Sequence, residues 1–187
     1  MTDQETPRPV AVVTGAGRRQ GIAAAIVERL GRDGFDVAFS SWRPYDERMT
    51  WGPDAGAADA LGAAVRAAGG RAVPVEVDFE DAAAPARLFD RAEDELGPVQ
   101  VLVVAHCESV DTTILDATVE SFDRHTAVNA RATWLLVREF ARVPPTPGGS
   151  RRRCGSGSRP LPRVAELGCR PTPPTWWRSC AQPRAAG

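Results

Sequence analysis

Glycines directly behind a short apolar run form the part of this chain best suited to binding a phosphate group. The segment reads Thr14-Gly15-Ala16-Gly17-Arg18-Arg19-Gln20-Gly21-Ile22-Ala23. Gly15 allows a sharp turn, Gly17 lets the backbone approach a ligand, and Gly21 opens a helix whose free N–H groups and dipole attract a pyrophosphate. A strand, a turn and a helix in this order favour a dinucleotide site over a plain tight turn.

The residues after the next predicted strand bear on which dinucleotide is bound. An acid at this place would bind the adenosine ribose hydroxyls, but the chain reads Ser40-Ser41-Trp42-Arg43. Together with Arg18 and Arg19, Arg43 makes the site better suited to a 2′-phosphate. We therefore predict NADP(H) rather than NAD(H), with arginines that are simply solvated as the alternative.

An acid also follows the third predicted strand, in Val77-Asp78-Phe79. Asp78 is expected at the same edge of the sheet, where its carboxylate accepts a hydrogen bond from an adenine amino group. The alternative is that Asp78 caps the following helix.

Short apolar runs alternate with amphipathic segments through most of the chain. The pattern predicts strands at 10–13, 36–41, 72–77 and 99–104, and helices at 22–32, 57–68, 83–96 and 119–142. The apolar residues expected to face the core from the first and last helices are Ile22, Ile26, Leu30, Phe122, Val128, Leu135, Leu136 and Phe140. Strictly alternating strands and helices predict an α/β fold with a doubly wound parallel sheet, whose ligands bind beyond the carboxyl ends of the strands.

Composition narrows the class of protein. With 187 residues, 43% hydrophobic and 25% charged, the chain reads as one soluble domain. It has no apolar run of spanning length and begins with polar and acidic residues, so we expect no membrane insertion and a cytoplasmic location. The four cysteines do not form a disulfide framework, and for His106, Cys107 and His125 ordinary packing is favoured over a metal site.

The composition of charged residues differs sharply between the segment up to Val143 and the segment that follows it. Through Val143 there are 23 acidic residues and 15 arginines, whereas the segment from Pro144 has eight arginines, nine prolines and the single acid Glu166. We predict a nucleotide-binding domain over 1–143, truncated after its fourth strand, and a disordered or poorly packed tail over 144–187. The abrupt change motivates the hypothesis that the tail is an out-of-frame translation of a GC-rich gene.

The residues of the tail also suggest a different class of function, nucleic-acid binding. Arg151-Arg152-Arg153 and Trp176-Trp177 are residue types that bind nucleic acid through phosphate contacts and base stacking. A solvated basic tail is favoured, because no binding module surrounds these charges.

The glycine turn, Asp78, the fourth strand and Asn129 in Ala127-Val128-Asn129-Ala130 together resemble the N-terminal half of a short-chain dehydrogenase/reductase, over about residues 8–143. The turn is two residues longer than the usual family spacing, which resembles a subgroup often labelled 3-oxoacyl-acyl-carrier-protein reductase. The resemblance implies a Rossmann-like fold, a nicotinamide cofactor, a small-molecule carbonyl or alcohol substrate and, in complete members, a homo-oligomer that we do not carry over to this chain. The cofactor contacts that it implies are Thr14, Gly15, Gly17, Arg18, Gly21, Ile22, Trp42, Arg43, Asp78, Phe79, Ala105 and His106.

The chain departs from the family after the fourth strand. The usual Asn-Asn-Ala-Gly falls on Val104-Ala105-His106-Cys107, so bracing by an asparagine side chain is missing. The last helix glycine of the family is Ala23, which is small enough to preserve close packing of helix on strand.

The resemblance implies a catalytic asparagine, a serine and a tyrosine followed four residues later by a lysine. Asn129 fills the first place, but the chain has no lysine, and its one tyrosine, Tyr45, is followed four residues later by Met49. A phenol with a pKa near 10 needs a neighbouring cation to exchange its proton at neutral pH. We therefore predict cofactor binding without catalysis, and a non-catalytic regulatory module stays open as an alternative.

Overall fold

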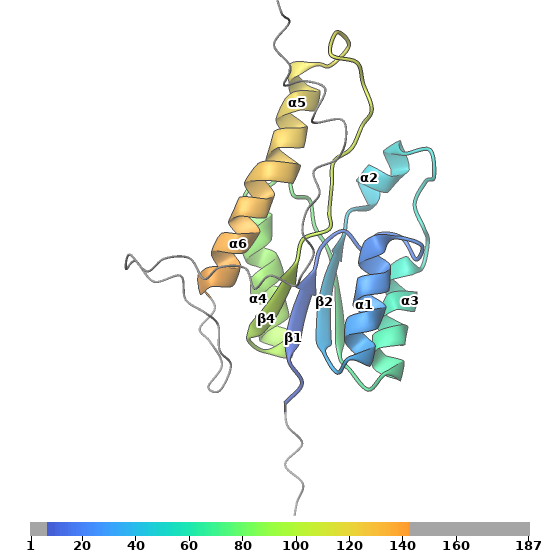
Figure 1. Cartoon of the computed structure of the whole chain (residues 1–187), viewed down its shortest axis with the longest axis vertical. Coiled ribbons are helices and arrows are strands. Elements are labelled where there is room, and N and C mark those ends of the chain that lie inside the picture. The colour runs from blue at the N-terminus through green and yellow to red at the C-terminus, as the bar shows by residue number, and fades with distance from the viewer. Residues whose placement is uncertain (1–6, 143–187) are drawn as a thin grey trace, which may run out of the picture. The chain divides into compact units, whose positions relative to one another are not determined.

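Four parallel strands form a single sheet in the computed structural model, which describes residues 7–142 (Figure 1). The strands are β1 (Val10–Val13), β2 (Asp36–Ser41), β3 (Ala72–Glu76) and β4 (Val99–Val103), in the order β3-β2-β1-β4. Each pair of neighbours is parallel. The predicted doubly wound α/β fold is confirmed.

Helices cover both faces of the sheet (Figure 1). They are α1 (Ile22–Arg32), α2 (Arg43–Arg48), α3 (Ala57–Ala67), α4 (Ala84–Leu96), α5 (Val119–His125), the π-helical segment η1 (Thr126–Ala132) and α6 (Thr133–Arg142). The last three run on from one another, where the sequence predicts a single helix. A π-helical turn carries more residues than an α-helical turn, so η1 changes which residues of the following helix face the sheet.

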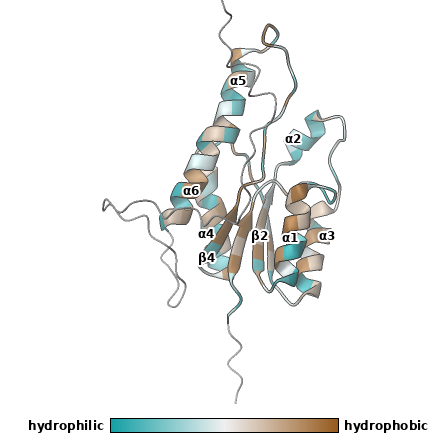
Figure 2. Cartoon of the chain, viewed as in Figure 1, coloured by the Kyte–Doolittle hydropathy of each residue, from teal (hydrophilic) through white to brown (hydrophobic). Residues whose placement is uncertain are grey.

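Two apolar clusters hold the layers together. On one face, α1 and α3 bury Ala24, Val27, Leu61 and Val65 against the sheet residue Phe39. On the other face the buried members from β1, α4 and α6 include Val12, Leu88, Phe89 and Leu136. Figure 2 shows the strands as mostly hydrophobic and the helices as two-sided, as burial of a sheet on both faces requires.

Two residues that the sequence pattern predicts in the core are exposed, so this part of the prediction is wrong. Ile22 is 80% exposed and Phe122 is 68% exposed. The α1 helix buries small residues instead, among them Ala23 and Gly31, because the helix lies close to the sheet and to α3. None of the α5 residues is buried, so Phe122 packs in neither apolar cluster of residues 7–142.

A further difference concerns the segment after β2, where the sequence pattern predicts no helix. Residues Arg43–Arg48 form the short helix α2, with Pro44 in its first turn. Proline is favoured there because its fixed φ suits a helix and its missing N–H would be unpaired anyway. Arg43 and Glu47 also form an i,i+4 ion pair at 2.8 Å, which supports the helix from its exposed side.

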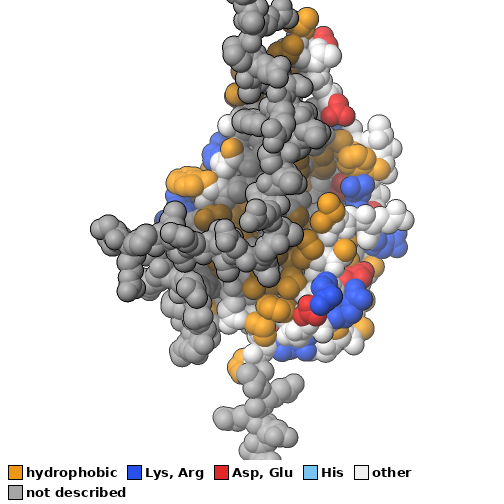
Figure 3. All heavy atoms as spheres, in the orientation of Figure 1, with side chains coloured by type: hydrophobic (Ala, Val, Ile, Leu, Met, Phe, Trp, Pro, Cys, Tyr) orange, Lys and Arg blue, Asp and Glu red, His pale blue; other side chains and the backbone are white. Residues whose placement is uncertain are grey.

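Charged side chains occupy the outer surface of α1. Arg29 pairs with Asp33, and Arg32 pairs with Glu28; Figure 3 shows arginine and acidic side chains gathered over this part of the molecule. Within residues 7–142, no helix is long and apolar enough to cross a membrane, and no cluster of side chains has the composition of a metal site.

The predictions for the tail at 144–187, namely poor packing, an out-of-frame origin and nucleic-acid binding, lie outside the described residues. So do Arg151 to Arg153 and Trp176-Trp177.

Candidate cofactor site

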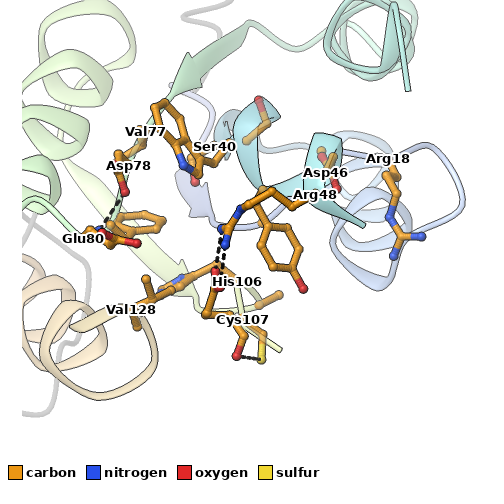
Figure 4. A pocket seen from close by; sticks show the side chains of 18 of the residues that line it. Arg18, Ser40, Asp46, Arg48, Val77, Asp78, Glu80, His106, Cys107 and Val128 are labelled. Atoms are coloured by element: carbon orange, nitrogen blue, oxygen red, sulfur yellow. Dashed lines mark hydrogen bonds and ion pairs between the residues drawn. The ribbon is translucent and has the colours of Figure 1, made fainter. Parts of the chain in front are cut away.

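A pocket of about 200 Å³ opens at the carboxyl edge of the sheet. The glycine turn, the end of β2, helix α2, the segment after β3 and the loop after β4 all contribute to it (Figure 4). Eight of the twelve predicted cofactor contacts line this pocket: Gly15, Gly17, Arg18, Trp42, Asp78, Phe79, Ala105 and His106. The other four, which do not line it, are Thr14, Gly21, Ile22 and Arg43.

Gly15 stands where a side chain has no room, and a Cβ on Gly17 would require the Asp46 carboxylate to move. Gly15 has φ +82°, and a Cβ built on it would lie 2.7 Å from the His106 backbone and 2.8 Å from the Ala105 carbonyl oxygen. A Cβ on Gly17 would lie 2.5 Å from Oδ2 of Asp46. Gly15 therefore brings the first turn against the loop after β4, and Gly17 brings it against α2.

Gly21 precedes α1 in an extended conformation, with φ −89° and ψ 159°. As the N-cap residue it offers no side-chain hydrogen bond, and no acidic residue lies in the first turn of α1. The free N–H groups and the positive end of the helix dipole therefore remain available to an anion. Ile22 lies beside them with its side chain exposed.

Thr14 and His106 join β1 to the loop after β4. The Thr14 hydroxyl lies 2.8 Å from Nδ1 of His106 and accepts a hydrogen bond from the Ala105 N–H at 3.1 Å. The other ring nitrogen of His106, Nε2, lies 3.0 Å from the Val128 carbonyl. Because a carbonyl only accepts, Nε2 must carry the hydrogen, and in neutral histidine Nδ1 then accepts from Thr14.

Burial lowers the pKa of His106 below its usual 6.5 and so favours the neutral ring that this hydrogen bonding requires. The ring also stacks on Phe79, with centroids 4.2 Å apart. The loop after β4 is thus braced by a histidine side chain, although the asparagine of the family is missing there. No motif in the sequence indicated this role for His106.

Asp78 lies in the pocket wall and does not cap a helix. Its Oδ1 accepts a hydrogen bond from the Glu80 N–H at 2.9 Å, while α4 begins only at Ala84 with Ala83 as its N-cap. The helix-cap alternative for Asp78 is therefore wrong, and its carboxylate remains directed at the pocket (Figure 4).

The three arginines assigned to a 2′-phosphate have different surroundings. Arg18 lies in the pocket with its guanidinium 4.3 Å from the ring centre of Trp51. Arg19 pairs with Asp54 at 2.6 Å and lowers the pKa of that carboxyl. Arg43 pairs with Glu47 on the outside of α2, and lines a second, neighbouring pocket.

Helix α2 places further residues in the pocket that the sequence did not single out. Asp46 is 7% exposed, lines both pockets and accepts a hydrogen bond from Trp51 Nε1 at 3.2 Å. Pro44 and the i,i+4 charge pair signal the helix in the sequence. The contact of Asp46 with the glycine turn depends on tertiary structure and leaves no sequence signal.

Arg48 crosses the mouth of the pocket to the loop after β4. Its two terminal nitrogens each lie 3.1 Å from a carboxylate oxygen of Glu108, which is 4% exposed (Figure 4). Tyr45, one turn earlier, also lines the pocket. Its pKa is raised, chiefly by burial and further by the charge of Glu108, against an opposing hydrogen bond from the Ser109 backbone.

Asn129 lies in η1 and is bound to the same loop. Its Oδ1 accepts from the Glu108 N–H at 2.8 Å, and its Nδ2 donates to the Glu108 carbonyl at 2.9 Å. Asn129 itself does not line the pocket, whereas its neighbour Val128 does. In this arrangement the asparagine fixes the position of the loop after β4.

A family model described as short chain dehydrogenase matches residues 9–149. A short-chain dehydrogenase/reductase of Armillaria gallica is 34% identical over 149 residues, which cover 80% of this chain and 53% of that protein. The chain spans about half the length of the curated relatives it matches.

Solved structures show the same likeness. A short chain dehydrogenase from Burkholderia cenocepacia, in complex with NADP, is 31% identical with a TM-score of 0.64, over 74% of this chain and 51% of that one. A blue fluorescent protein from a metagenomic library, in complex with NADPH, is 32% identical with a TM-score of 0.62, over 74% of this chain and 52% of that one. Because the family model matches well over half of the 187 residues, the chain belongs to the short chain dehydrogenase family.

Proposed function

We propose that this chain binds NADP(H) as the cofactor-binding half of a carbonyl or alcohol oxidoreductase. The observation that carries the proposal is the glycine turn at the carboxyl edge of the sheet. There Gly15 leaves no room for a side chain, a Cβ on Gly17 would displace the Asp46 carboxylate, and the N-terminus of α1 has no side-chain cap. These features fit a pyrophosphate, because backbone N–H groups and a helix dipole can meet it directly.

The preference for NADP(H) is supported by charge at the end of β2. Ser41, Trp42 and Arg43 stand where an acid would bind ribose hydroxyls, and Arg18 lines the pocket. The solved Burkholderia and metagenomic relatives contain NADP and NADPH.

NAD(H) is the second candidate, and Asp46 favours it. The buried Asp46 carboxylate faces Gly17 and lines both pockets. A carboxylate there would accept hydrogen bonds from ribose hydroxyls and would repel a 2′-phosphate.

Calorimetric titration with NADPH and with NADH, using wild type and Asp46→Asn, separates the two cofactors. We expect wild type to bind NADPH more tightly, and Asp46→Asn to strengthen NADPH binding more than NADH binding. Asp59→Asn on the exposed surface of α3 removes one charge outside both pockets and is the matched control. Tighter binding of NADH by wild type would overturn the preference, and binding of neither would overturn the function.

We further propose that these 187 residues do not catalyse hydride transfer. A bound nicotinamide would supply the hydride, but the substrate oxygen also needs a proton donor. Tyr45 is the one tyrosine, and no lysine is present to lower its pKa. The surroundings of Tyr45 raise its pKa instead. A regulatory module that binds the cofactor without turnover is the corresponding non-enzymatic function.

The out-of-frame origin of residues 144–187 stays a hypothesis with a direct test. Reading the gene in its other two frames should reveal a downstream segment with tyrosine followed four residues later by lysine. If neither frame encodes one, the hypothesis is wrong. The cytoplasmic location and the lack of nucleic-acid binding also stay predictions.

A further inference from the structure

Helix α2 belongs to the wall of the pocket but not to the apolar core. Asp46 is its one buried residue, and no residue of α2 is a member of either apolar cluster of residues 7–142. The helix has only six residues, so its own hydrogen bonds stabilise it little. A segment with few buried apolar contacts can open at a low cost in free energy.

Two glycines lie between α2 and α3. Gly52 and Gly56 have φ +66° and +82°, and a Cβ added to either would meet nothing within 4 Å. Glycine changes its backbone angles more freely than other residues, and the open surroundings leave room for such a change. The connection from α2 to α3 is therefore suited to act as a hinge.

A bidentate ion pair holds α2 across the mouth of the pocket. The two terminal nitrogens of Arg48 each lie 3.1 Å from a carboxylate oxygen of Glu108, and both residues line the pocket (Figure 4). Beside this pair, the Ser109 backbone forms a hydrogen bond with Tyr45. The loop after β4 is itself held in place, because Asn129 bonds both backbone groups of Glu108. The ion pair thus joins a wall without apolar anchoring to a wall that is fixed.

We propose that residues 43–52 form a lid, which must open for the dinucleotide to enter and to leave, and that the Arg48–Glu108 pair is its latch. This inference rests on the proposed cofactor binding. Opening would carry Tyr45, Asp46 and Arg48 away from the pocket that they line. A latch on the path of exchange slows entry and exit alike, whereas a residue that only contacts the bound cofactor slows exit.

Stopped-flow measurement of NADPH binding tests the lid through two rate constants. Glu108→Gln keeps the shape of the side chain and removes the charge that binds Arg48, while Asn129 can still bond the backbone. We expect the association and dissociation rate constants each to rise by about 3- to 30-fold, so the Kd should change less than either rate constant. Asp33→Asn is the matched control, because it removes one acid and one exposed ion pair on α1, outside both pockets. It should change neither rate constant.

Arg48→Gln breaks the same latch with the opposite change in net charge. Simple electrostatic steering of an anionic cofactor would make its association slower. The lid predicts that both rate constants rise in this variant too. Slower association in Arg48→Gln, or a rise in the dissociation rate constant alone in both variants, would overturn the lid.

Hydrogen–deuterium exchange of the protein without NADPH measures the opening itself. The amides of residues 43–52 should exchange faster in Glu108→Gln than in wild type, while those of α3 should not change. Unchanged exchange over 43–52, or an equal increase in α3, would overturn the latch. Failure of wild type to bind NADPH or NADH is a different result, because it overturns the proposed function and with it the role of the lid.

Discussion

Asn129 holds both backbone groups of Glu108, accepting from its N–H at 2.8 Å and donating to its carbonyl at 2.9 Å. The two residues belong to η1 and to the loop after β4, which are separated by 21 positions in the sequence. One side chain therefore holds the loop after β4 in position, and His106 and Cys107 of this loop line the pocket.

Replacing this amide by a carboxylate should loosen the loop. Asn129→Asp loses the Nδ2 donor and places a negative oxygen against the Glu108 carbonyl. Because Asn129 is exposed, we expect the free energy of unfolding to fall by about 0.5–1.5 kcal/mol in urea denaturation, the net value of a typical hydrogen bond. Thr133→Ala, which removes an exposed hydrogen bond to the Asn129 carbonyl, should have a much smaller effect. Equal losses in the two variants would contradict the role of the amide.

Gly15 and Gly52 offer a matched pair for the packing of the glycine turn. Both have positive φ, +82° and +66°, but only Gly15 faces backbone atoms within 3 Å of an added Cβ. Gly52→Ala should cost about 1–2 kcal/mol from backbone strain alone. Gly15→Ala should cost clearly more in the same denaturation experiment, because the loop after β4 must move. If the two losses are the same, the close approach at Gly15 does not matter for stability.

Acidification should destabilise the protein through His106. Its folded pKa is lowered by burial, so below pH 6.5 the unfolded chain binds a proton that the folded protein resists. This contribution is fully present above the unfolded pKa and is lost as the pH falls from about 6.5 through the folded value. Melting temperatures measured from pH 7.5 to 5 should fall less steeply for His106→Gln than for wild type. Parallel profiles would show that His106 does not titrate in this way.

The Arg48–Glu108 pair gives a prediction about a buried charge. Arg48→Ala leaves the carboxylate of Glu108, which is 4% exposed, without its bidentate partner. We expect a loss of about 1–3 kcal/mol, less than for a fully buried pair because Arg48 is 38% exposed. Adding Glu108→Gln to this variant should recover part of the loss, since the unpaired charge is gone. A double variant as unstable as the sum of the two single ones would contradict this coupling.

The regular part of the fold could be predicted from the sequence because its signals are local. Runs such as Val10–Val13 are buried on both faces and read as continuous apolar segments. The boundaries of α1 follow from Gly21 and from the turn at Gly34. The predicted burial of Ile22 and Phe122 was wrong because periodicity locates a stripe on a helix without showing whether another element covers it.

In the candidate site, too, some residues could be placed from the sequence and others could not. Gly15, Gly17 and Asp78 could be placed from their positions at strand ends, because carboxyl ends of parallel strands meet at one edge. The roles of Asp46 and His106 could not, since each depends on a partner more than 25 residues away in the sequence: Gly17 for Asp46, and Thr14 for His106. Such contacts arise only when the sheet has assembled.

The central claim is that this chain keeps a cofactor site and lacks the chemistry of the family. The most direct test is to measure NADPH binding by calorimetry, and NADPH-dependent reduction of ketones by absorbance, on one sample of the 187-residue protein. We expect saturable binding of NADPH, with no turnover above the background measured without protein. Absence of binding to NADPH and to NADH would contradict the first part, and turnover that is lost in Tyr45→Phe would contradict the second.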